Sequence, residues 1–140
     1  MSEKPYGKPL PMPDLETQPF WDGARAGRLR LPKCNDCGQY HFLPRALCPH
    51  CRSENWTWVD ASGDGVIYSF TIAHRGAGPA FKDDAPYAIA IIELAEGPRM
   101  MSNIVTDDLS RIAVDGAVRV TFDAVTDDIT LPKFTLVEAA

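Results

Sequence analysis

The sequence contains no long hydrophobic run and no excess of positive charge. Its longest apolar run, Tyr87 to Ile92, has six residues, whereas a helix needs about 20 to cross a bilayer. We therefore expect no membrane span. The net charge is −5 and no block of like charges stands out. A sequence-independent nucleic-acid binder normally has a basic face, so this composition disfavours that class.

The common signatures of catalysis are also missing. No nucleophile elbow, glycine-rich phosphate loop or His-x-x-x-His pattern occurs. A serine–histidine–aspartate set stays open by counting alone, since Ser69, Ser102, His74 and several aspartates are present. The pairs Asp107–Asp108 and Asp127–Asp128 fall in predicted turns, where solvated carboxylates are the ordinary explanation. We expect a chain without catalytic activity of its own.

All four cysteines lie in two Cys-x2-Cys pairs that are separated by ten residues. Such pairs can place four sulfurs at the corners of a tetrahedron, which suits Zn²⁺. The alternatives are two disulfides or four buried thiols. Because the sequence opens with a polar stretch rather than a secretory signal, we expect a cytoplasmic protein, in which disulfides are disfavoured. The pattern predicts a structural zinc site formed by Cys34, Cys37, Cys48 and Cys51, with no cysteine left as a nucleophile.

Two histidines, His41 and His50, lie close to the cysteine pairs, and either is a possible replacement ligand. With four cysteines in register, we interpret them instead as groups that surround the ligands or lie at the surface. Four thiolates also hold iron, so a rubredoxin-like electron carrier is a further possibility. A colourless metal-loaded protein would exclude that carrier.

The N-terminal part predicts an arm followed by a short helix. Residues 1–16 contain four prolines and no periodicity, which predicts a flexible arm, either disordered or laid along a partner. A helix fits Gln18 to Ala26, with Thr17 as its N-cap and Pro19 in the first turn. A helix this short is marginal alone, so one side must pack against something else.

We assign the helix and the zinc ribbon to residues 17–62. Between the cysteine pairs, Tyr40 to Pro44 resembles one arm of a hairpin, and Arg45 to Leu47 resembles the return strand. The ribbon ends at Ser62-Gly-Asp-Gly65, which is a strong turn signal. The turn predicts a second domain over residues 63–140.

The second domain is β-patterned. Five predicted strands with one short irregular piece suit a Greek-key barrel of the OB type. Closure is the safer prediction, because an open sheet would leave exposed edges. The overall prediction is a mainly β chain with a helix, a rubredoxin-like zinc ribbon and a five-stranded OB-fold barrel. The strands are expected at residues 66–72, 87–94, 100–105, 117–125 and 133–137.

One long connection, residues 73–86, joins the first two predicted strands of the barrel. In OB folds this loop lies along the common binding face, and loops of this length tend to be functional or disordered. Its side chains His74, Arg75, Phe81 and Lys82 suggest a cationic and aromatic lip for an anionic ligand. The alternative is a solvated loop whose phenylalanine fills the barrel mouth.

The whole pattern resembles a known family over residues 17 to 137, namely the zinc-ribbon/OB-fold companion proteins of thiolase-like enzymes, which are linked with acyl-CoA. The cysteine pairs alone occur in many ribbons, but their combination with an upstream Phe-Trp helix and a downstream barrel is specific. The resemblance rests on the four cysteines and on Pro19-Phe-Trp-Asp-Gly23, Gly27-Arg-Leu29, Pro44-Arg45, Cys48-Pro49, Gly63-Asp-Gly65, Tyr68-Ser69, Pro86-Tyr87 and Leu94 to Gly97.

This resemblance implies a non-catalytic subunit that binds a thiolase-like enzyme acting on CoA thioesters by thiolysis, acyl transfer or retro-aldol cleavage. It implies that the helix and ribbon hold the partner and that the barrel helps to enclose acyl-CoA. Phe20 and Trp21 become candidates for the partner interface. The family pattern supplies no residue motif for CoA itself, so the assignment of Arg75 or Lys82 to a phosphate rests on charge and loop position. The alternative function is a nucleic-acid-binding ribbon and OB module.

Overall fold

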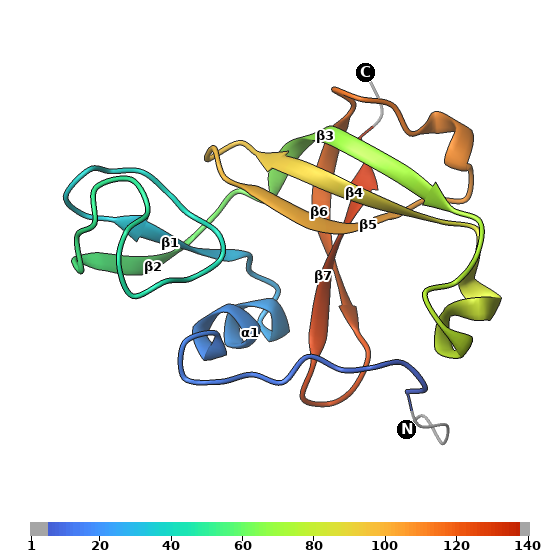
Figure 1. The fold of residues 1–140 in the computed structure, drawn as a ribbon, viewed down its shortest axis with the longest axis horizontal. Coiled ribbons are helices and arrows are strands. Elements are labelled where there is room, and N and C mark those ends of the chain that lie inside the picture. The colour runs from blue at the N-terminus through green and yellow to red at the C-terminus, as the bar shows by residue number, and fades with distance from the viewer. Residues whose placement is uncertain (1–5, 138–140) are drawn as a thin grey trace.

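A computed structural model describes residues 6–137 as a mainly β chain with an N-terminal helix, a two-stranded ribbon and a closed barrel (Figure 1). No helix among these residues is long and apolar enough to span a membrane. The elements in chain order are α1 (Gln18–Arg25), β1 (Arg30–Cys34), β2 (Trp56–Asp60), β3 (Asp64–Ala73), the 3₁₀ helix η1 (Pro79–Asp84), β4 (Tyr87–Leu94), β5 (Arg99–Val105), the 3₁₀ helix η2 (Leu109–Arg111), β6 (Ala117–Ala124) and β7 (Thr130–Leu136).

The five expected barrel strands and the closure of the barrel are confirmed. The strand order is β3-β4-β5-β7-β6, and β3 pairs with both β4 and β6. Side chains of β4 alternate between half-buried and buried, as a strand with one face on a core requires. The centre of the barrel is filled by fully buried large side chains, among them Ile67, Ile92, Val118 and Phe134.

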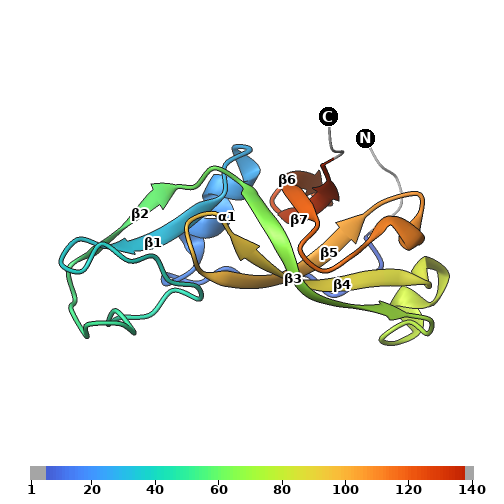
Figure 2. The same ribbon diagram turned by 90° about the horizontal axis from the view of Figure 1, so that it is seen from above.

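Helix α1 lies in the angle between the ribbon and the barrel (Figure 2) and contacts β1, β6 and β7. Thr17 holds the N-cap position, but its side chain makes no capping hydrogen bond. The predicted N-cap position is therefore confirmed, but the side-chain hydrogen bond that usually accompanies it is not formed. The Thr17 hydroxyl instead donates to Asp14 Oδ1 at 3.1 Å, within the turn that precedes the helix, so the oxygen is oriented away from the helix amides.

The described part of the N-terminal arm, residues 6–14, runs from α1 toward the loop that follows β3 (Figure 1). Lys8 Nζ lies 2.8 Å from Asp84 Oδ2 in η1. The same ammonium group lies 5.4 Å from the ring centroid of Tyr6 and 6.0 Å from that of Phe81. These contacts place the arm against the chain's own barrel domain.

The ribbon consists of β1 and β2 in antiparallel register, from Arg30 opposite Asp60 to Cys34 opposite Trp56. The predicted hairpin over residues 40–47 is wrong. Only Tyr40 pairs there, in an isolated bridge with Lys33, and the rest of the segment is irregular. Pro44 lacks a backbone N–H and so disfavours a regular ladder.

A close backbone approach connects the ribbon to the barrel. Gly63 has φ +83°, and a Cβ built on it would overlap Val120 Cγ1. The Val120 amide donates to the Gly63 carbonyl at 2.8 Å. Nearby, the Ser62 amide donates to Glu96 Oε2, also at 2.8 Å. The turn predicted at Ser62 to Gly65 is wrong, because residues 61–63 form an irregular connection and β3 already begins at Asp64. This connection depends on a residue without a side chain at position 63.

Candidate metal centre and binding pockets

The two cysteine pairs converge on one point in the ribbon. The four Sγ atoms all lie within 4.8 Å of one another, with Cys34 and Cys51 3.5 Å apart and Cys37 and Cys48 3.7 Å apart. A tetrahedron with Zn–S bonds of about 2.3 Å has edges of about 3.8 Å, whereas a disulfide measures about 2.05 Å. The cluster therefore fits zinc and excludes disulfides between these pairs.

The sulfurs perturb one another electrostatically. The Cys37 amide donates to Cys34 Sγ at 3.5 Å, and this hydrogen bond, together with those from the Asp36 amide and the Cys51 and Cys37 thiols, lowers the pKa of Cys34 to about 7. The Ser53 amide lowers the pKa of Cys51, but hydrogen bonding to the Cys34 sulfur and burial outweigh it and raise that pKa to about 12. Zinc would hold all four groups as thiolates. Because protein sulfurs fill every ligand position, the site is a closed, structural zinc site.

The two nearby histidines occupy different environments. The His50 amide donates to Cys48 Sγ at 3.4 Å, and its ring Nε2 lies 3.2 Å from the Tyr40 carbonyl oxygen. His41 is 3% exposed and packs edge-to-face on Trp56, with ring centroids 5.5 Å apart. Neither ring nitrogen of His41 has a hydrogen-bond partner among the described residues. His41 is therefore not a surface group: it is buried in the ribbon and makes no hydrogen bond to a cysteine sulfur.

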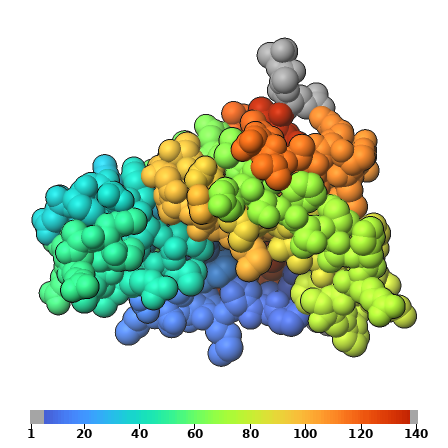
Figure 3. Space-filling view, turned by 45° about the horizontal axis from the view of Figure 1, so that its top comes forward, coloured from blue at the N-terminus to red at the C-terminus, as the bar shows by residue number. Residues whose placement is uncertain are grey.

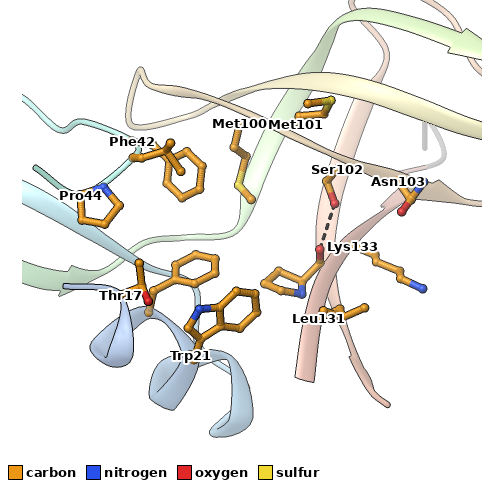
Figure 4. Close-up of a pocket in the computed structure, with 13 residues that line it drawn as sticks. Thr17, Trp21, Phe42, Pro44, Met100, Met101, Ser102, Asn103, Leu131 and Lys133 are labelled. Atoms are coloured by element: carbon orange, nitrogen blue, oxygen red, sulfur yellow. Dashed lines mark hydrogen bonds between the residues drawn. The ribbon is translucent and has the colours of Figure 1, made fainter. Parts of the chain in front are cut away.

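An apolar pocket lies where α1, the irregular ribbon segment and strands β5 and β7 meet (Figure 4). Its volume is about 290 Å³. Phe20 is 7% exposed and contacts the Trp21 ring edge-on at 5.0 Å between centroids. Trp21 is half-buried in the pocket wall. The lining residues are Thr17, Phe20, Trp21, Phe42, Leu43, Pro44, Met100, Met101, Ser102, Asn103, Leu131, Pro132 and Lys133.

Polar atoms of the pocket wall are used within the protein. The Ser102 hydroxyl donates to the Pro132 carbonyl at 2.9 Å (Figure 4), and the Asn103 amide group donates to the Ala88 carbonyl at 3.0 Å. The Lys133 side chain extends away from the pocket interior (Figure 4). An occupant of the interior would therefore meet mainly carbon and sulfur atoms.

Sequence reasoning identified only the helix residues of this pocket. The rest of the wall comes from positions that are distant in sequence, including Phe42 in the ribbon, Met100 in β5 and Leu131 in β7. A strand pattern predicts which face of β5 is buried, but it does not predict that α1 packs near that strand. The pocket depends on this tertiary arrangement.

The loop between β3 and β4 brings together three of the four predicted ligand-binding side chains. His74, Arg75 and Lys82 line one cavity of about 520 Å³. Phe81 lies outside it, with its ring centroid 6.4 Å from that of Tyr87. A Cβ on Gly76 would lie 2.6 Å from the Phe81 carbonyl carbon, so the glycine lets the loop pack closely on η1. This loop forms the end of the molecule opposite the ribbon (Figure 3).

Comparison with known families divides the chain into two matched parts. Residues 21–57 match the family model of the rubredoxin-like zinc ribbon domain of ChsH2. Residues 58–123 match that of the ChsH2 C-terminal OB-fold domain. These matches agree with the metal cluster and the barrel described above.

The similar proteins are named either as scaffold proteins or as subunits of enzymes that act on CoA compounds. A DUF35 domain-containing scaffold protein of Methanothermobacter thermautotrophicus is 37% identical over 97 residues, which are 69% of this chain and 72% of that protein. The benzoylsuccinyl-CoA thiolase subunit BbsA of Thauera aromatica is 33% identical, with 74% and 70% covered. A probable enoyl-CoA hydratase alpha subunit of Thermomonospora curvata is 32% identical over 91% of this chain. The chain spans only 39% of that last protein's length.

Two solved structures share the fold. The structure described as the Ltp2-ChsH2(DUF35) aldolase contains a chain that matches with a TM-score of 0.80 and 31% identity, covering 91% of this chain and 98% of that one. A DUF35 protein of unknown function from Sulfolobus solfataricus matches with a TM-score of 0.62 and 16% identity, covering 88% of this chain and 86% of that one. The second match supports the fold alone.

Proposed function

This chain belongs to the ChsH2 family of DUF35 proteins, which join a rubredoxin-like zinc ribbon to an OB-fold domain, and we propose that it is a non-catalytic accessory subunit of a thiolase-like enzyme. The observation that carries the proposal is the match over nearly the full length of a chain in an aldolase assembly. The thiolase subunit from Thauera aromatica supports a partner of the same kind. The substrate of the assembly would be an acyl-CoA thioester.

The chemistry of the described residues supports an accessory role. A closed zinc site with four cysteine ligands offers no position for a substrate or an activated water. Among residues 6–137, none of the hydrogen bonds joins a histidine ring to a serine hydroxyl. The Ser102 hydroxyl donates to a backbone carbonyl instead. Carbon–carbon cleavage beside a thioester needs an oxyanion hole and an acid–base pair, which the partner would supply.

We assign the loop cavity to the phosphate groups of CoA. His74, Arg75 and Lys82 line it together, and cationic side chains bind phosphate through charge-assisted hydrogen bonds. Neutralising Arg75 and Lys82 with glutamine should weaken CoA binding in titration calorimetry. The matched control is Arg25→Gln, which removes an exposed charge from α1. Equal CoA affinity of the wild type, the variant with Arg75 and Lys82 replaced, and the Arg25→Gln control would refute the assignment.

The nucleic-acid alternative receives less support. Within the described residues, six lysine and arginine side chains lie within 3.4 Å of a carboxylate oxygen, which reduces the charge available to a phosphate backbone. A gel-shift series at physiological salt should show no binding to single-stranded or duplex probes. Saturable, salt-dependent binding would favour the alternative.

The accessory role is tested by isolating the tagged chain from its native host. We expect a thiolase-like enzyme to co-purify and the pure chain alone to turn over no acyl-CoA. Mass spectrometry identifies the partner, and release of free CoA measures turnover. Robust activity of the isolated chain, or the absence of such a partner, would overturn the proposal.

A further inference from the structure

A second groove adjoins the apolar pocket. It has a volume of about 460 Å³ and shares Asn103, Leu131 and Lys133 with the pocket. One side of the groove is formed by Tyr6 and Lys8 of the N-terminal arm. In the space-filling view, the arm and α1 run along one side of the molecule from the ribbon to the loop after β3 (Figure 3).

The two spaces lie along a weak seam of the barrel. Strands β5 and β7 pair only at Ile104 with Phe134 and at Val105 with Thr135. The earlier residues of β5 and β7 form no backbone pairs with each other. A side-chain hydrogen bond, from the Ser102 hydroxyl of β5 to the Pro132 carbonyl of β7, connects the two strands there. The shared lining residues come from this stretch, in which β5 pairs with β4 and β7 pairs with β6 but β5 and β7 do not pair with each other. The seam therefore explains why the pocket continues into the groove.

Polarity changes along the path. The pocket is walled by aromatic rings and Met100. The groove adds two ion pairs, Lys133 with Asp123 and Lys8 with Asp84, each at 2.8 Å. An ammonium group has three donors, so each lysine keeps donors for a further acceptor. Other residues of η1, Pro79 and Lys82, line the cationic loop cavity, whereas Phe81 and Asp84 line the groove. An elongated ligand would thus meet apolar, mixed and then cationic surroundings.

We propose that the pocket and the groove form one acyl-binding channel that the N-terminal arm covers. The acyl group lies between Trp21 and Met100, and the thioester end runs past Lys133 beneath Lys8. The ligand class is an acyl thioester whose acyl part is a medium chain or a ring, because apolar cavities of this kind bind apolar molecules and about 300 Å³ is the lower end of ligand pockets. This inference rests on the proposed function and assigns residues to its substrate.

Methionine methyl groups report on the channel directly. The protein labelled with ¹³C-methyl methionine gives separate signals for Met100, which lines the pocket, and Met12, which is 89% exposed. Octanoyl-CoA should shift the Met100 signal saturably and leave Met12 unchanged. Free CoA should leave both unchanged. Leu131→Trp should fill the channel and abolish the Met100 response, and Lys8→Met should weaken octanoyl-CoA binding several-fold by loosening the arm.

The outcomes separate this inference from the accessory role. A folded protein that co-purifies with its enzyme but shows no saturable Met100 response would overturn the channel and leave the accessory role intact. A Met100 response to the partner enzyme alone, and not to octanoyl-CoA, would also overturn it, because the pocket would then take a partner side chain. A response to octanoyl-CoA that Leu131→Trp removes would support the channel even if no enzyme co-purified. Chemical shifts elsewhere confirm that each variant is folded.

Discussion

The ring centroids of Phe20 and Phe42 lie 5.7 Å apart, with their planes inclined at 53°. This contact joins α1 to the irregular ribbon segment, so the helix is held to the ribbon as well as to the barrel. Phe20 is almost completely buried, whereas the adjacent Trp21 is only half-buried. The two residues that the sequence offered as interface candidates therefore have different surroundings.

Phe20→Ala should destabilise the isolated protein strongly. Loss of a buried phenylalanine costs about 3–5 kcal/mol through lost burial and the cavity left behind. Trp21→Ala should lower the free energy of unfolding less, because part of its ring is already exposed. Urea unfolding measures both changes. A pull-down of the partner by Trp21→Ala, which we expect to stay folded, then tests the interface role separately.

Cys48→Ser should remove the metal and unfold the ribbon over residues 28–60. Zinc binding in such ribbons contributes on the order of 10 kcal/mol of folding free energy, and the buried Cys48 is one of its four ligands. The measurements are zinc content and partner capture, and capture should be lost. Replacement of His50, whose ring lies beside Tyr40, should leave the zinc content unchanged. Unchanged assembly of the Cys48→Ser protein would refute the docking role of the ribbon.

His41 should make the protein less stable as the pH falls below about 6.5, the ordinary pKa of histidine. Burial lowers the pKa of His41 in the folded protein, and the positive charges of His50 and Arg45 lower it further. Below that pH the unfolded chain takes up a proton that the folded chain does not, so unfolding becomes more favourable. The slope is at most about 1.4 kcal/mol per pH unit, and it persists down to the folded pKa.

His41→Phe should flatten this pH dependence, because phenylalanine keeps a ring against Trp56 without a titrating group. The free energy of unfolding is measured with denaturant at about pH 7.5, 6.5 and 5.5, which bracket the ordinary histidine pKa. Zinc content is checked at each pH, since thiolate ligands also protonate in acid. Identical slopes for the wild type and His41→Phe would show that His41 does not control the effect.

The sequence is informative wherever a local pattern determines structure. The four cysteines carry their spacing in the chain, and Tyr87 to Leu94 is a nearly continuous apolar segment, so both the metal cluster and β4 are predictable. The hairpin predicted from Tyr40 to Leu47 is wrong because the apolar residues of this segment do not belong to paired strands. Phe42 packs on α1, and Phe42, Leu43 and Pro44 line the pocket instead. The burial of His41 is not predictable for a similar reason, since only the fold buries it.

The pocket and the groove lie beyond prediction for a related reason. Their walls combine the arm, α1, the ribbon and strands β5 and β7, which are not consecutive in sequence. Both spaces exist because β5 and β7 pair through only a few residues. A hydrophobic pattern does not predict how many residues two strands will pair. The loop cations are predictable because they are close in sequence, although the cavity that they line excludes Phe81.

Gly63→Ala should destabilise the protein, and Gly78→Ala should not. Gly63 combines a left-handed φ of +83° with a Cβ position that overlaps Val120 Cγ1, so alanine there meets both backbone strain of about 1–2 kcal/mol and overpacking of about 1–3 kcal/mol. Gly78 has extended backbone with φ 164°, and no atom lies within 4 Å of the place that a methyl group would take. Thermal unfolding compares the two variants under the same conditions. Equal stability of both variants would contradict the role of Gly63 in the connection between ribbon and barrel. If the two parts must keep a fixed relation, replacement of Gly63 should also weaken partner capture.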